Sequence, residues 1–357
     1  MKKVYQKDKT LARGKDVYIG IDVHKETWHI AARVDGEEIF YGSAPGDYQP
    51  LRKLLDRFKA CRIKVAYEAG PFGFWLHDKL IDDGIDTIVV PPSLIPTESG
   101  NRVKTDKRDS RKLAMLLEKN MLKKVHVLTE EDRADRELVR TRRQLMNHRC
   151  DVMRQIKSKL LFYGIKSPFS NKKDGWSKRY VKWLRELTFE QEAVKVSLES
   201  LIDLYEYLTS QVKKISKQVV ALSLSDKYSH KLKLLRSVPG IGILIGMELL
   251  VELADMERFK TAQQIASYMG LTPSEYSTGD HIHQGRITRC GNKRARTCLV
   301  ESSWHLIGKD PVMRFKYLKL KNRKGAKKAI IAIARNLIMR IRRIILNDEP
   351  YIVGMAA

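Results

Sequence analysis

The chain has 357 residues, with 68 Lys and Arg against 42 Asp and Glu, a net charge of +26 and 43% hydrophobic residues. This hydrophobic content is enough for folded cores and excludes wholesale disorder, and the length allows two domains with an extended connector. The excess of positive charge favours nucleic acid as the partner, with a merely soluble basic surface as the alternative.

Membrane proteins and metal-thiolate proteins are excluded by simple patterns. No apolar run approaches the roughly 18 residues of a membrane span, and no apolar segment of signal-peptide type follows the lysine-rich N-terminus. The four cysteines are widely spaced without a CxxC pair, which argues against a zinc site and a disulfide framework. We therefore expect a protein of the reducing cytoplasm with no membrane partner.

Residues 1–128 have the pattern of an α/β domain. A strand at 17–23 and an alternating strand at 27–34 precede the tight-turn pair Asp35-Gly36 and a strand near 37–42. The elements predicted next are a helix at 47–60, a strand at 62–68, a helix at 72–83, a strand at 87–90 and a helix from about 106. This order is typical of the ribonuclease-H-like (RuvC-like) fold, whereas a Rossmann domain would begin βαβ with a glycine-rich turn.

Residues 129–228 are predicted to form a long helical connector. Helices are expected at about 131–163 and beyond a Gly/Ser/Lys-rich break at 164–178. Apolar residues of the second helix recur every 3.5 positions, which indicates a coiled-coil seam. The seam consists of Val194, Leu198, Leu201, Tyr205, Leu208, Val212, Ile215 and Val219. The helices could fold back as a hairpin, pair with another protomer, or belong to a compact bundle.

Residues 229–357 are predicted to be a mainly helical domain. The turn Val238-Pro239-Gly240-Ile241-Gly242 lies between apolar helical runs and resembles a helix-hairpin-helix turn, in which Gly240 and Gly242 would let backbone N–H groups approach a phosphate. A plain αα corner is the alternative. Helices are expected at 261–269 and 292–307. Twelve Lys or Arg and no acid occur from 311 to 347, which ends in a basic amphipathic helix at 329–346. We expect the acid-free stretch from Arg314 to Arg343 to neutralise phosphates of nucleic acid.

Four carboxylates are predicted at strand ends or on one helix face: Asp22, Glu68, Asp106 and Asp109. Asp22 and Glu68 each close an apolar strand, and Asp106 and Asp109 are three residues apart on a helix. Each acid alone would be explained as a cap or an ion-pair partner. Together, on rigid strands and one helix, the four carboxylates are suited to bind Mg²⁺, or Mn²⁺ in its place. Two such cations, about 4 Å apart, would clamp the attacking and leaving oxygens of a phosphodiester.

Three short motifs resemble the signature of the DEDD transposases of the insertion sequence 110 family, whose catalytic domain is similar to the RuvC resolvase. The motifs are Gly20-Ile21-Asp22-Val23-His24-Lys25, Tyr67-Glu68-Ala69-Gly70-Pro71 and Lys104-Thr105-Asp106-Lys107-Arg108-Asp109. Further matches follow in order: Val238-Pro239-Gly240-Ile241-Gly242, Gly270-Leu271-Thr272-Pro273, Tyr276-Ser277-Thr278-Gly279 and Gly285-Arg286-Ile287-Thr288. The resemblance covers nearly the whole chain.

The resemblance implies a bacterial, nucleoid-associated recombinase that excises and inserts its own mobile element. In this family a structured RNA from the element pairs with donor and target DNA, and the protein works as a dimer or tetramer. The four acids bind Mg²⁺, and a serine from the C-terminal domain attacks a DNA phosphate to form a phosphoserine. The family motif is aromatic, any residue, serine, glycine. It places Thr278 at the serine position and Ser277 one residue earlier, and Ser277, a primary hydroxyl, is slightly favoured.

Cations follow the predicted nucleophile without an intervening acid. They are Arg286, Arg289, Lys293, Arg294 and Arg296. At this place they would stabilise negative charge in the transition state. Two other functions remain open: a RuvC-like metal-dependent, structure-specific endonuclease that uses water as the nucleophile, and an inactive nucleic-acid-binding transposase relic. An actin-like phosphotransferase is excluded because no Gly/Thr phosphate loop follows Asp22.

Overall fold

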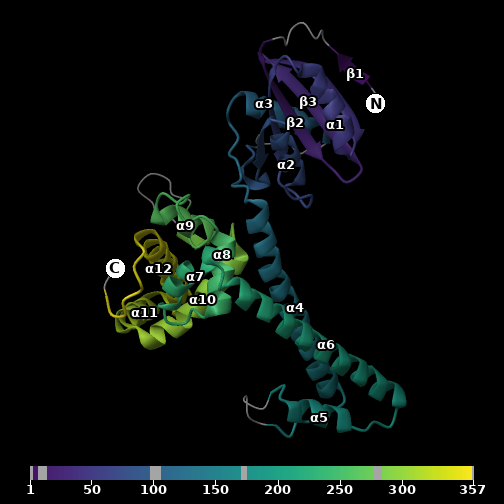
Figure 1. The fold of residues 1–357 in the computed structure, drawn as a ribbon. Helices are drawn as coiled ribbons and strands as arrows, with labels where there is room; N and C mark the ends of the chain where they lie inside the picture. Colours follow the sequence, from purple (N-terminus) through teal and green to yellow (C-terminus); the bar gives the residue numbers. More distant parts are fainter. Residues whose placement is uncertain (1–2, 7–13, 97–105, 170–174, 276–283, 356–357) are drawn as a thin grey trace. The chain divides into compact units, whose positions relative to one another are not determined.

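The computed structural model describes residues 3–6, 14–96, 106–169, 175–275 and 284–355. The chain divides into two compact units, Met1–Val127 and Leu128–Ala357. The first unit is built on a mixed β-sheet and the second is mainly helical (Figure 1). The finer division into 1–128, 129–228 and 229–357 stays a prediction. Within the described ranges, no helix is long and apolar enough to cross a membrane.

The sheet of the first unit has six strands in the order β1-β4-β3-β2-β5-β6. Strands β1 to β4 form antiparallel pairs, and β5 and β6 continue the sheet in parallel from β2. The strands are β1 (Lys3–Gln6), β2 (Asp16–Val23), β3 (Thr27–Val34), β4 (Glu37–Pro45), β5 (Arg62–Glu68) and β6 (Asp86–Val90). The predicted order of strands and helices is confirmed, and β1 is an additional edge strand that no sequence signal indicated.

Helices cover both faces of this sheet. They are α1 (Tyr48–Leu55), the 3₁₀ turn η2 (Asp56–Phe58), α2 (Trp75–Asp82), the 3₁₀ turn η3 (Pro92–Leu94) and α3 (Asp106–Glu118). The fully buried side chains of Val17, Ile19 and Ile21 on β2 share one apolar core with leucines of α1 and α2. Helix α3 lies on the opposite face, because side chains alternate along a strand and Gly20 contacts α3.

Three small residues let α3 approach the sheet closely. Gly20 on β2 is in register with Ala31 on β3 and with Ala66 on β5. A Cβ atom at Gly20 would come within 3.0 Å of the Ser110 carbonyl oxygen and the Ala114 backbone nitrogen. The backbone of α3 therefore rests on β2 where no side chain intervenes.

A contact at the C-terminal end of α3 shows in which direction the helix runs along β2. Glu118 accepts a hydrogen bond from Arg33 Nε at 2.8 Å, and Arg33 is paired with Tyr18, near the start of β2. Because Ser110 lies over Gly20 and Glu118 lies toward Tyr18, the residues before Ser110 extend toward the other end of β2, where Asp22 is located. The helix thus runs antiparallel to β2, with its first turn toward the end of that strand.

Two long antiparallel helices begin the second unit. Helix α4 (Glu130–Phe162) and helix α6 (Glu192–Leu222) run side by side (Figure 1). Arg142 Nε donates to Ser216 Oγ at 2.8 Å, and Lys159 Nζ donates to Ser197 Oγ at 2.6 Å. The predicted helices therefore fold back as a hairpin within one chain. A short helix, α5 (Lys178–Glu186), packs on them and was not predicted. Coiled-coil packing in the strict sense stays a prediction.

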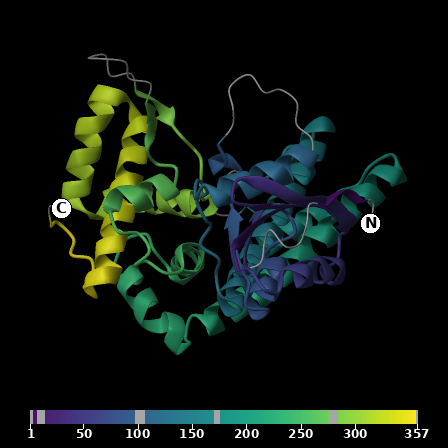
Figure 2. The same ribbon diagram turned by 90° about the horizontal axis from the view of Figure 1, so that it is seen from above.

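The remaining elements are helices that share one apolar core and two short strands that pair with each other. They are α7 (Asp226–Arg236), α8 (Ile243–Leu253), α9 (Ala262–Tyr268), β7 (Pro273–Glu275), β8 (Gln284–Ile287), α10 (Lys293–Lys309), α11 (Pro311–Lys324) and α12 (Ala326–Asn347). Helices α11 and α12 lie side by side in Figures 1 and 2. The apolar stripe of α12 is buried in this core, which explains the amphipathic pattern predicted for 329–346.

The contact at Gly20 gives a test of the fold. We expect Gly20→Ala to destabilise the packing of α3 by about 1–3 kcal/mol, because the new methyl group meets backbone atoms that cannot rotate away. Faster amide hydrogen exchange in peptides from α3 would measure this loss of stability. Gly70→Ala is the matched control in the same unit, since a Cβ there meets only ordinary contacts at 4.0 Å. Unchanged protection of α3 in Gly20→Ala would contradict the close approach.

Candidate active site and nucleic-acid interface

Asp22 and Glu68 lie next to each other at the ends of neighbouring strands. The parallel register pairs Gly20 with Ala66 and Ile21 with Tyr67, so Asp22 and Glu68 occupy the next positions. Both side chains point to the face that α3 covers, because they follow Gly20 and Ala66 by two residues. The Asp22 side chain is 14% exposed, and Glu68 is half-buried. The sheet thus presents two carboxylates on one face at one edge.

Helix α3 brings a third acid toward the same edge. Asp109 immediately precedes Ser110, so it belongs to the part of α3 that extends toward the Asp22 end of β2, and its side chain is half-buried. Asp106 begins the helix one turn earlier, and its side chain lies outside the described residues. Among the side chains that are described, no three ligand-type residues gather closely enough to hold a metal ion. The metal site as a whole therefore stays a prediction that depends on Asp106.

Two histidines flank Asp22. His24 Nε2 is 3.1 Å from Asp22 Oδ2, and its side chain is half exposed. His29 is paired with Asp22 across the β2–β3 ladder, and its Nδ1 is 3.0 Å from the Tyr41 hydroxyl. Neither histidine is predicted as a site residue from the sequence alone. The alternation of strand 27–34 could have placed His29 on the Asp22 face.

Arginine 111 fixes the helix that carries the acids. It forms a bidentate ion pair with Glu38 on β4, with N–O distances of 2.7 and 2.6 Å, and its guanidinium lies 4.4 Å from the centroid of the Tyr41 ring. Bidentate pairs of this type restrict orientation as well as distance. Together with the Arg33–Glu118 pair, this contact holds α3 along its length on β3 and β4.

The predicted nucleophiles Ser277 and Thr278 lie outside the described residues. Strands β7 and β8, on either side of them in the chain, pair antiparallel, with Pro273 opposite Ile287 and Glu275 opposite Gln284. Two backbone hydrogen bonds fasten the base of this hairpin. Thr288 N donates to Thr272 O at 2.9 Å, and Asn292 N donates to Tyr268 O at 3.1 Å. The segment 276–283 is thus joined to a well-anchored pair of strands.

The predicted cations after the hairpin have two different roles. Arg286, Arg289 and Lys293 are exposed and Arg294 is half-buried, so all four can reach a ligand. Arg296 differs, because its Nη1 donates to Met269 O at 2.7 Å. Burial, and secondarily the charge of Arg289, lower the pKa of Arg296. Arg296 therefore stabilises the fold, and the other four cations remain available to an anion.

The two glycines of the 238–242 turn also differ. Gly240 has φ of 92°, and a Cβ there would lie 2.8 Å from the Ser302 carbonyl oxygen. Ser302 Oγ in turn donates to Gly240 O at 3.2 Å, so Gly240 is required for packing against α10. A Cβ at Gly242, the residue before α8, would have no neighbour within 4 Å among the described atoms. A helix-hairpin-helix role for this turn stays a prediction, and only Gly242 has the open surroundings that it requires.

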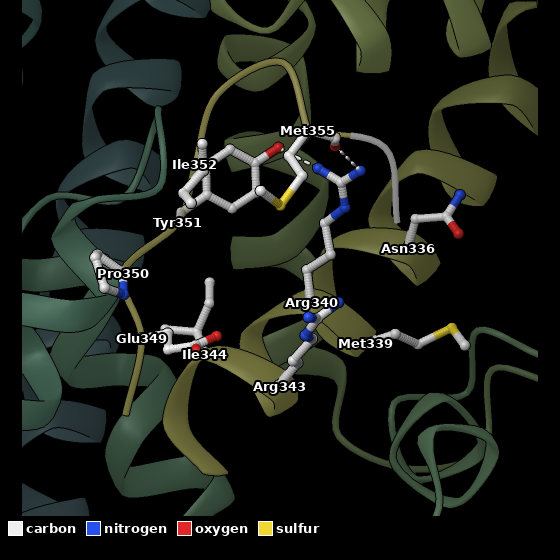
Figure 3. A pocket seen from close by; sticks show the side chains of 10 residues that line it. All are labelled: Asn336, Met339, Arg340, Arg343, Ile344, Glu349, Pro350, Tyr351, Ile352 and Met355. Carbon is white, nitrogen blue, oxygen red and sulfur yellow. Dashed lines mark hydrogen bonds between the residues drawn. The ribbon is translucent and has the colours of Figure 1, made fainter. Parts of the chain in front are cut away.

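The basic C-terminal stretch is divided between surface and core contacts. The cations of α11 are exposed: Arg314, Lys316, Lys319, Lys321, Arg323 and Lys324. By contrast, Arg342 donates to Phe259 O at 2.7 Å, and Arg340 donates to the Tyr351 hydroxyl at 2.6 Å and to Met355 O at 2.9 Å (Figure 3). The prediction that the whole stretch from Arg314 to Arg343 neutralises phosphates is therefore wrong for Arg340 and Arg342.

The C-terminal tail is fastened by one buried carboxylate. Tyr351 donates to Asp310 Oδ2 at 2.5 Å, and Asp310 Oδ1 accepts from Met313 N at 3.0 Å as the N-cap of α11. Burial would raise the pKa of Asp310, but these hydrogen bonds and the charge of Arg340 outweigh it and lower the pKa. Burial and the bond to Asp310 raise the pKa of Tyr351 to about 12. The cavity beside Arg340, of about 210 Å³, is closed on one side by this tail.

A second buried carboxylate, Glu248 on α8, is poorly paired. Its side chain is 4% exposed, and its Oε1 has no hydrogen-bond partner among the described residues. Burial raises the pKa of Glu248, and the charges of Arg143 and Arg294 and a hydrogen bond with Cys298 compensate only in part. The ionised form of Glu248 therefore costs folding free energy.

A mixed sheet with carboxylates at one edge, followed by a basic helical region, is consistent with a DNA transposase of the RuvC-like type. Two family models match the chain. The model described as "Transposase", of the DEDD type, matches residues 19–165, and the model of the "Transposase IS116/IS110/IS902 family" matches residues 232–318.

Curated relatives agree with this class. The candidate transposase y4qE of Sinorhizobium fredii is 32% identical over 301 residues, 83% of this chain and 73% of the relative. The transposase for insertion sequence element IS1533 of Leptospira borgpetersenii is 26% identical over 352 residues, 94% of this chain and 97% of the relative. The pilin gene-inverting protein of Moraxella bovis is 30% identical over 167 residues, 45% of this chain and 52% of the relative. The chain belongs to the IS110/IS116 family of transposases, which carry out DNA transposition and recombination.

The raised pKa of Glu248 predicts a pH-dependent stability. The contribution of this group is fully present below the ordinary glutamate pKa, about 4.3, and is lost as pH rises through the higher folded-state value. We expect Glu248→Gln to raise the melting temperature at pH 7–8 and to give no gain near pH 4. If the substitution removes about 1 kcal/mol of this free-energy cost, the melting temperature of a unit of this size should rise by about 2–4 °C.

Thermal unfolding at both pH values measures this effect. Glu257→Gln is the matched control, because Glu257 is an exposed glutamate of the same unit. A lower melting temperature of Glu248→Gln at pH 7–8 would contradict the account of Glu248 as an uncompensated charge.

Proposed function

We propose that this transposase excises and inserts a mobile element by metal-assisted cleavage and rejoining of DNA, with a hydroxyl of the second unit as the nucleophile. The observation that carries the proposal is the arrangement of Asp22 and Glu68, in register on the face that α3 covers, with Asp109 on that helix.

The donor set fits a hard divalent cation. Asp22, Glu68, Asp106 and Asp109 supply only carboxylate oxygens, which Mg²⁺ and Mn²⁺ prefer, and two of them stand on rigid strands. A bound cation would neutralise charge on the phosphodiester and polarise its oxygens. His24 Nε2, at 3.1 Å from Asp22 Oδ2, is a hydrogen-bond partner that restricts the orientation of this carboxylate.

The hydroxyl of Ser277, or of Thr278, forms a bond to the DNA phosphorus while the bond from phosphorus to the leaving sugar oxygen breaks. The attacking hydroxyl gives up its proton, and the leaving oxygen gains one. The resulting phosphoester keeps the strand attached to the protein until the hydroxyl of another strand reverses the step. Arg286, Arg289, Lys293 and Arg294 would stabilise the additional negative charge during attack.

The nucleic-acid partners are DNA at the element ends and target, and a guide RNA from the element. The exposed cations of α11 support binding to the phosphates of either polymer, because each neutralised phosphate releases counterions. The acids and the nucleophile belong to different units, so a homo-oligomer, a dimer or a tetramer, could complete the site in trans.

A covalent adduct tests the proposal. Incubation with element-end DNA, guide RNA and Mg²⁺ should trap a protein–DNA adduct in the wild type and lose it at least about 10²-fold in Asp22→Ala. Ser277→Ala combined with Thr278→Val should abolish it, and the single variants show which hydroxyl attacks. Denaturing electrophoresis of labelled DNA measures the adduct.

Two outcomes would reject parts of this proposal. An adduct that persists in the Ser277→Ala, Thr278→Val double variant would reject the nucleophile assignment. Metal-dependent nicking without any adduct would indicate instead the hydrolytic, RuvC-like nuclease with water as the attacking group. Lys59→Ala serves as the control and should form the adduct as the wild type does, since Lys59 is an exposed lysine before β5, at the end of that strand opposite Glu68.

A further inference from the structure

Trp304 on α10 is a large aromatic side chain that the fold leaves half uncovered. It is 49% exposed, whereas its neighbours Ser303 and Leu306 on the same helix are fully buried. The Trp304 ring lies 5.8 Å from the Tyr317 ring on α11, at an interplanar angle of 70°. Tyr317 thus supports the indole from one side, and about half of the Trp304 side chain remains accessible to a ligand.

The position next to Trp304 on the surface of α10 carries no side chain. Gly308 is four residues after Trp304, so the two occupy adjacent positions on one face of the helix. Gly308 is exposed, and a Cβ atom there would have no neighbour within 4 Å among the described atoms. The space beside the indole in this direction is therefore open.

Trp304 and Gly308 line a cavity of about 680 Å³ that also reaches the 238–242 turn. The other lining residues are Pro239, Gly240, His305, Lys309 and Val353. A second cavity, of about 390 Å³, shares Pro239, Gly240 and His305 with the first and extends along the turn from Arg236 to Gly242. The residues that line the two cavities together form the Trp304 surface.

Hydrogen bonds fix the walls of the Trp304 surface. Ser302 Oγ on α10 donates to Gly240 O at 3.2 Å, which holds the turn against the helix. Tyr351 N donates to Ser237 Oγ at 2.7 Å, so the tail that carries Val353 is fastened beside the turn. A surface that is already formed loses little conformational entropy when a ligand binds.

The charge of the Trp304 surface favours a polyanion. Arg236 and Lys309 are exposed in its lining, and the described residues that line it include no acid. Glu301, one turn before Trp304, has a partner of its own, since its Oε1 is 3.8 Å from Arg143 Nη2. A second copy of this chain, with a net charge of +26, would be repelled, whereas a nucleic-acid strand has the complementary charge.

The exposed indole adds a requirement that a DNA duplex does not meet. Aromatic side chains stack on the flat faces of nucleobases, largely without regard to sequence. In a duplex these faces are covered by the neighbouring base pairs, so only an unpaired base can offer one to Trp304. Transposition moves a strand from one duplex to another, and nucleotides must leave their base pairs during that transfer.

We propose that the Trp304 surface binds an unpaired nucleotide of the recombining DNA, with the base stacked on the indole and the phosphates bound by Lys309 and Arg236. The space beside Gly308 gives the base its place on the indole. The inference rests on the function of the family in DNA recombination. It does not depend on the proposed metal site or on the hydroxyl nucleophile.

Two variants test the stacking contact. Trp304→Ala removes the aromatic surface. Gly308→Leu keeps the indole and the charge but fills the space beside it, and it replaces a helical glycine by a better helix former, so the fold is preserved. We expect each variant of the full-length protein to bind fluorescein-labelled oligo(dT) about fivefold more weakly or worse. Fluorescence anisotropy in the presence of EDTA, where no DNA is cleaved, measures the dissociation constant.

Three controls separate stacking from other effects. Oligo(dT) paired with oligo(dA) should bind to both variants within about twofold of the wild type, because its bases cannot stack on the indole. Phe162→Ala should bind oligo(dT) within about twofold of the wild type, since Phe162 is an 82% exposed aromatic residue at the far end of α4. Lys309→Ala should weaken the binding of both DNAs and reduce the salt dependence.

Several outcomes would overturn the inference. They are a wild type that does not bind oligo(dT), unchanged oligo(dT) binding by both variants, and an equal loss for paired and unpaired DNA. A loss confined to oligo(U) would instead identify RNA as the occupant, and a smaller oligomer of Trp304→Ala in analytical ultracentrifugation would identify a second copy of the chain. The binding assay needs no adduct, so a failure of the proposed function at the adduct step leaves this test intact.

Discussion

Helix α3 lies against the sheet at Gly20, Ala31 and Ala66, where three neighbouring strands carry no side chain larger than a methyl group. This close contact determines where the helix begins relative to the ends of β2 and β5. Because α3 runs antiparallel to β2, the first turns of the helix, which carry Asp109, lie toward the ends of the strands that carry Asp22 and Glu68. The candidate active site is thus a consequence of backbone packing, and the carboxylates themselves need contribute nothing to the stability of that packing.

Three buried carboxylates of the second unit, those of Glu252, Asp310 and Glu248, differ in how completely they are hydrogen-bonded. Glu252 accepts hydrogen bonds from Arg140 and Asn292, and Asp310 accepts them from Tyr351 and the Met313 backbone. Glu248, one turn from Glu252, lacks a full set of partners, so its ionised form costs folding free energy. The contrast shows that the sequence pattern of acids on α8 does not disclose which acid is structural, because pairing depends on residues of α4 and α10 far along the chain.

Much of the first unit could be predicted because its signals are local. Strand alternation, the Asp35-Gly36 turn and the prolines after β6 fix the element order, and strand adjacency then places Asp22 beside Glu68. The close approach at Gly20 and the role of His29 depend on register between strands, which no local pattern supplies. In the second unit, the charge of Arg340 and Arg342 predicted phosphate contacts. These side chains instead satisfy backbone carbonyls of distant segments. Local sequence does not reveal such long-range partners.

We propose that the acids of β2, β5 and α3 together hold a divalent cation. Titration of the full-length protein with Mn²⁺, followed by electron paramagnetic resonance, measures this directly in the absence of DNA. The account predicts saturable binding in the wild type and its loss in Asp22→Ala, Glu68→Ala and Asp109→Ala, with no loss in Asp16→Ala at the opposite end of β2. Equal Mn²⁺ binding by the wild type and all four variants would contradict it.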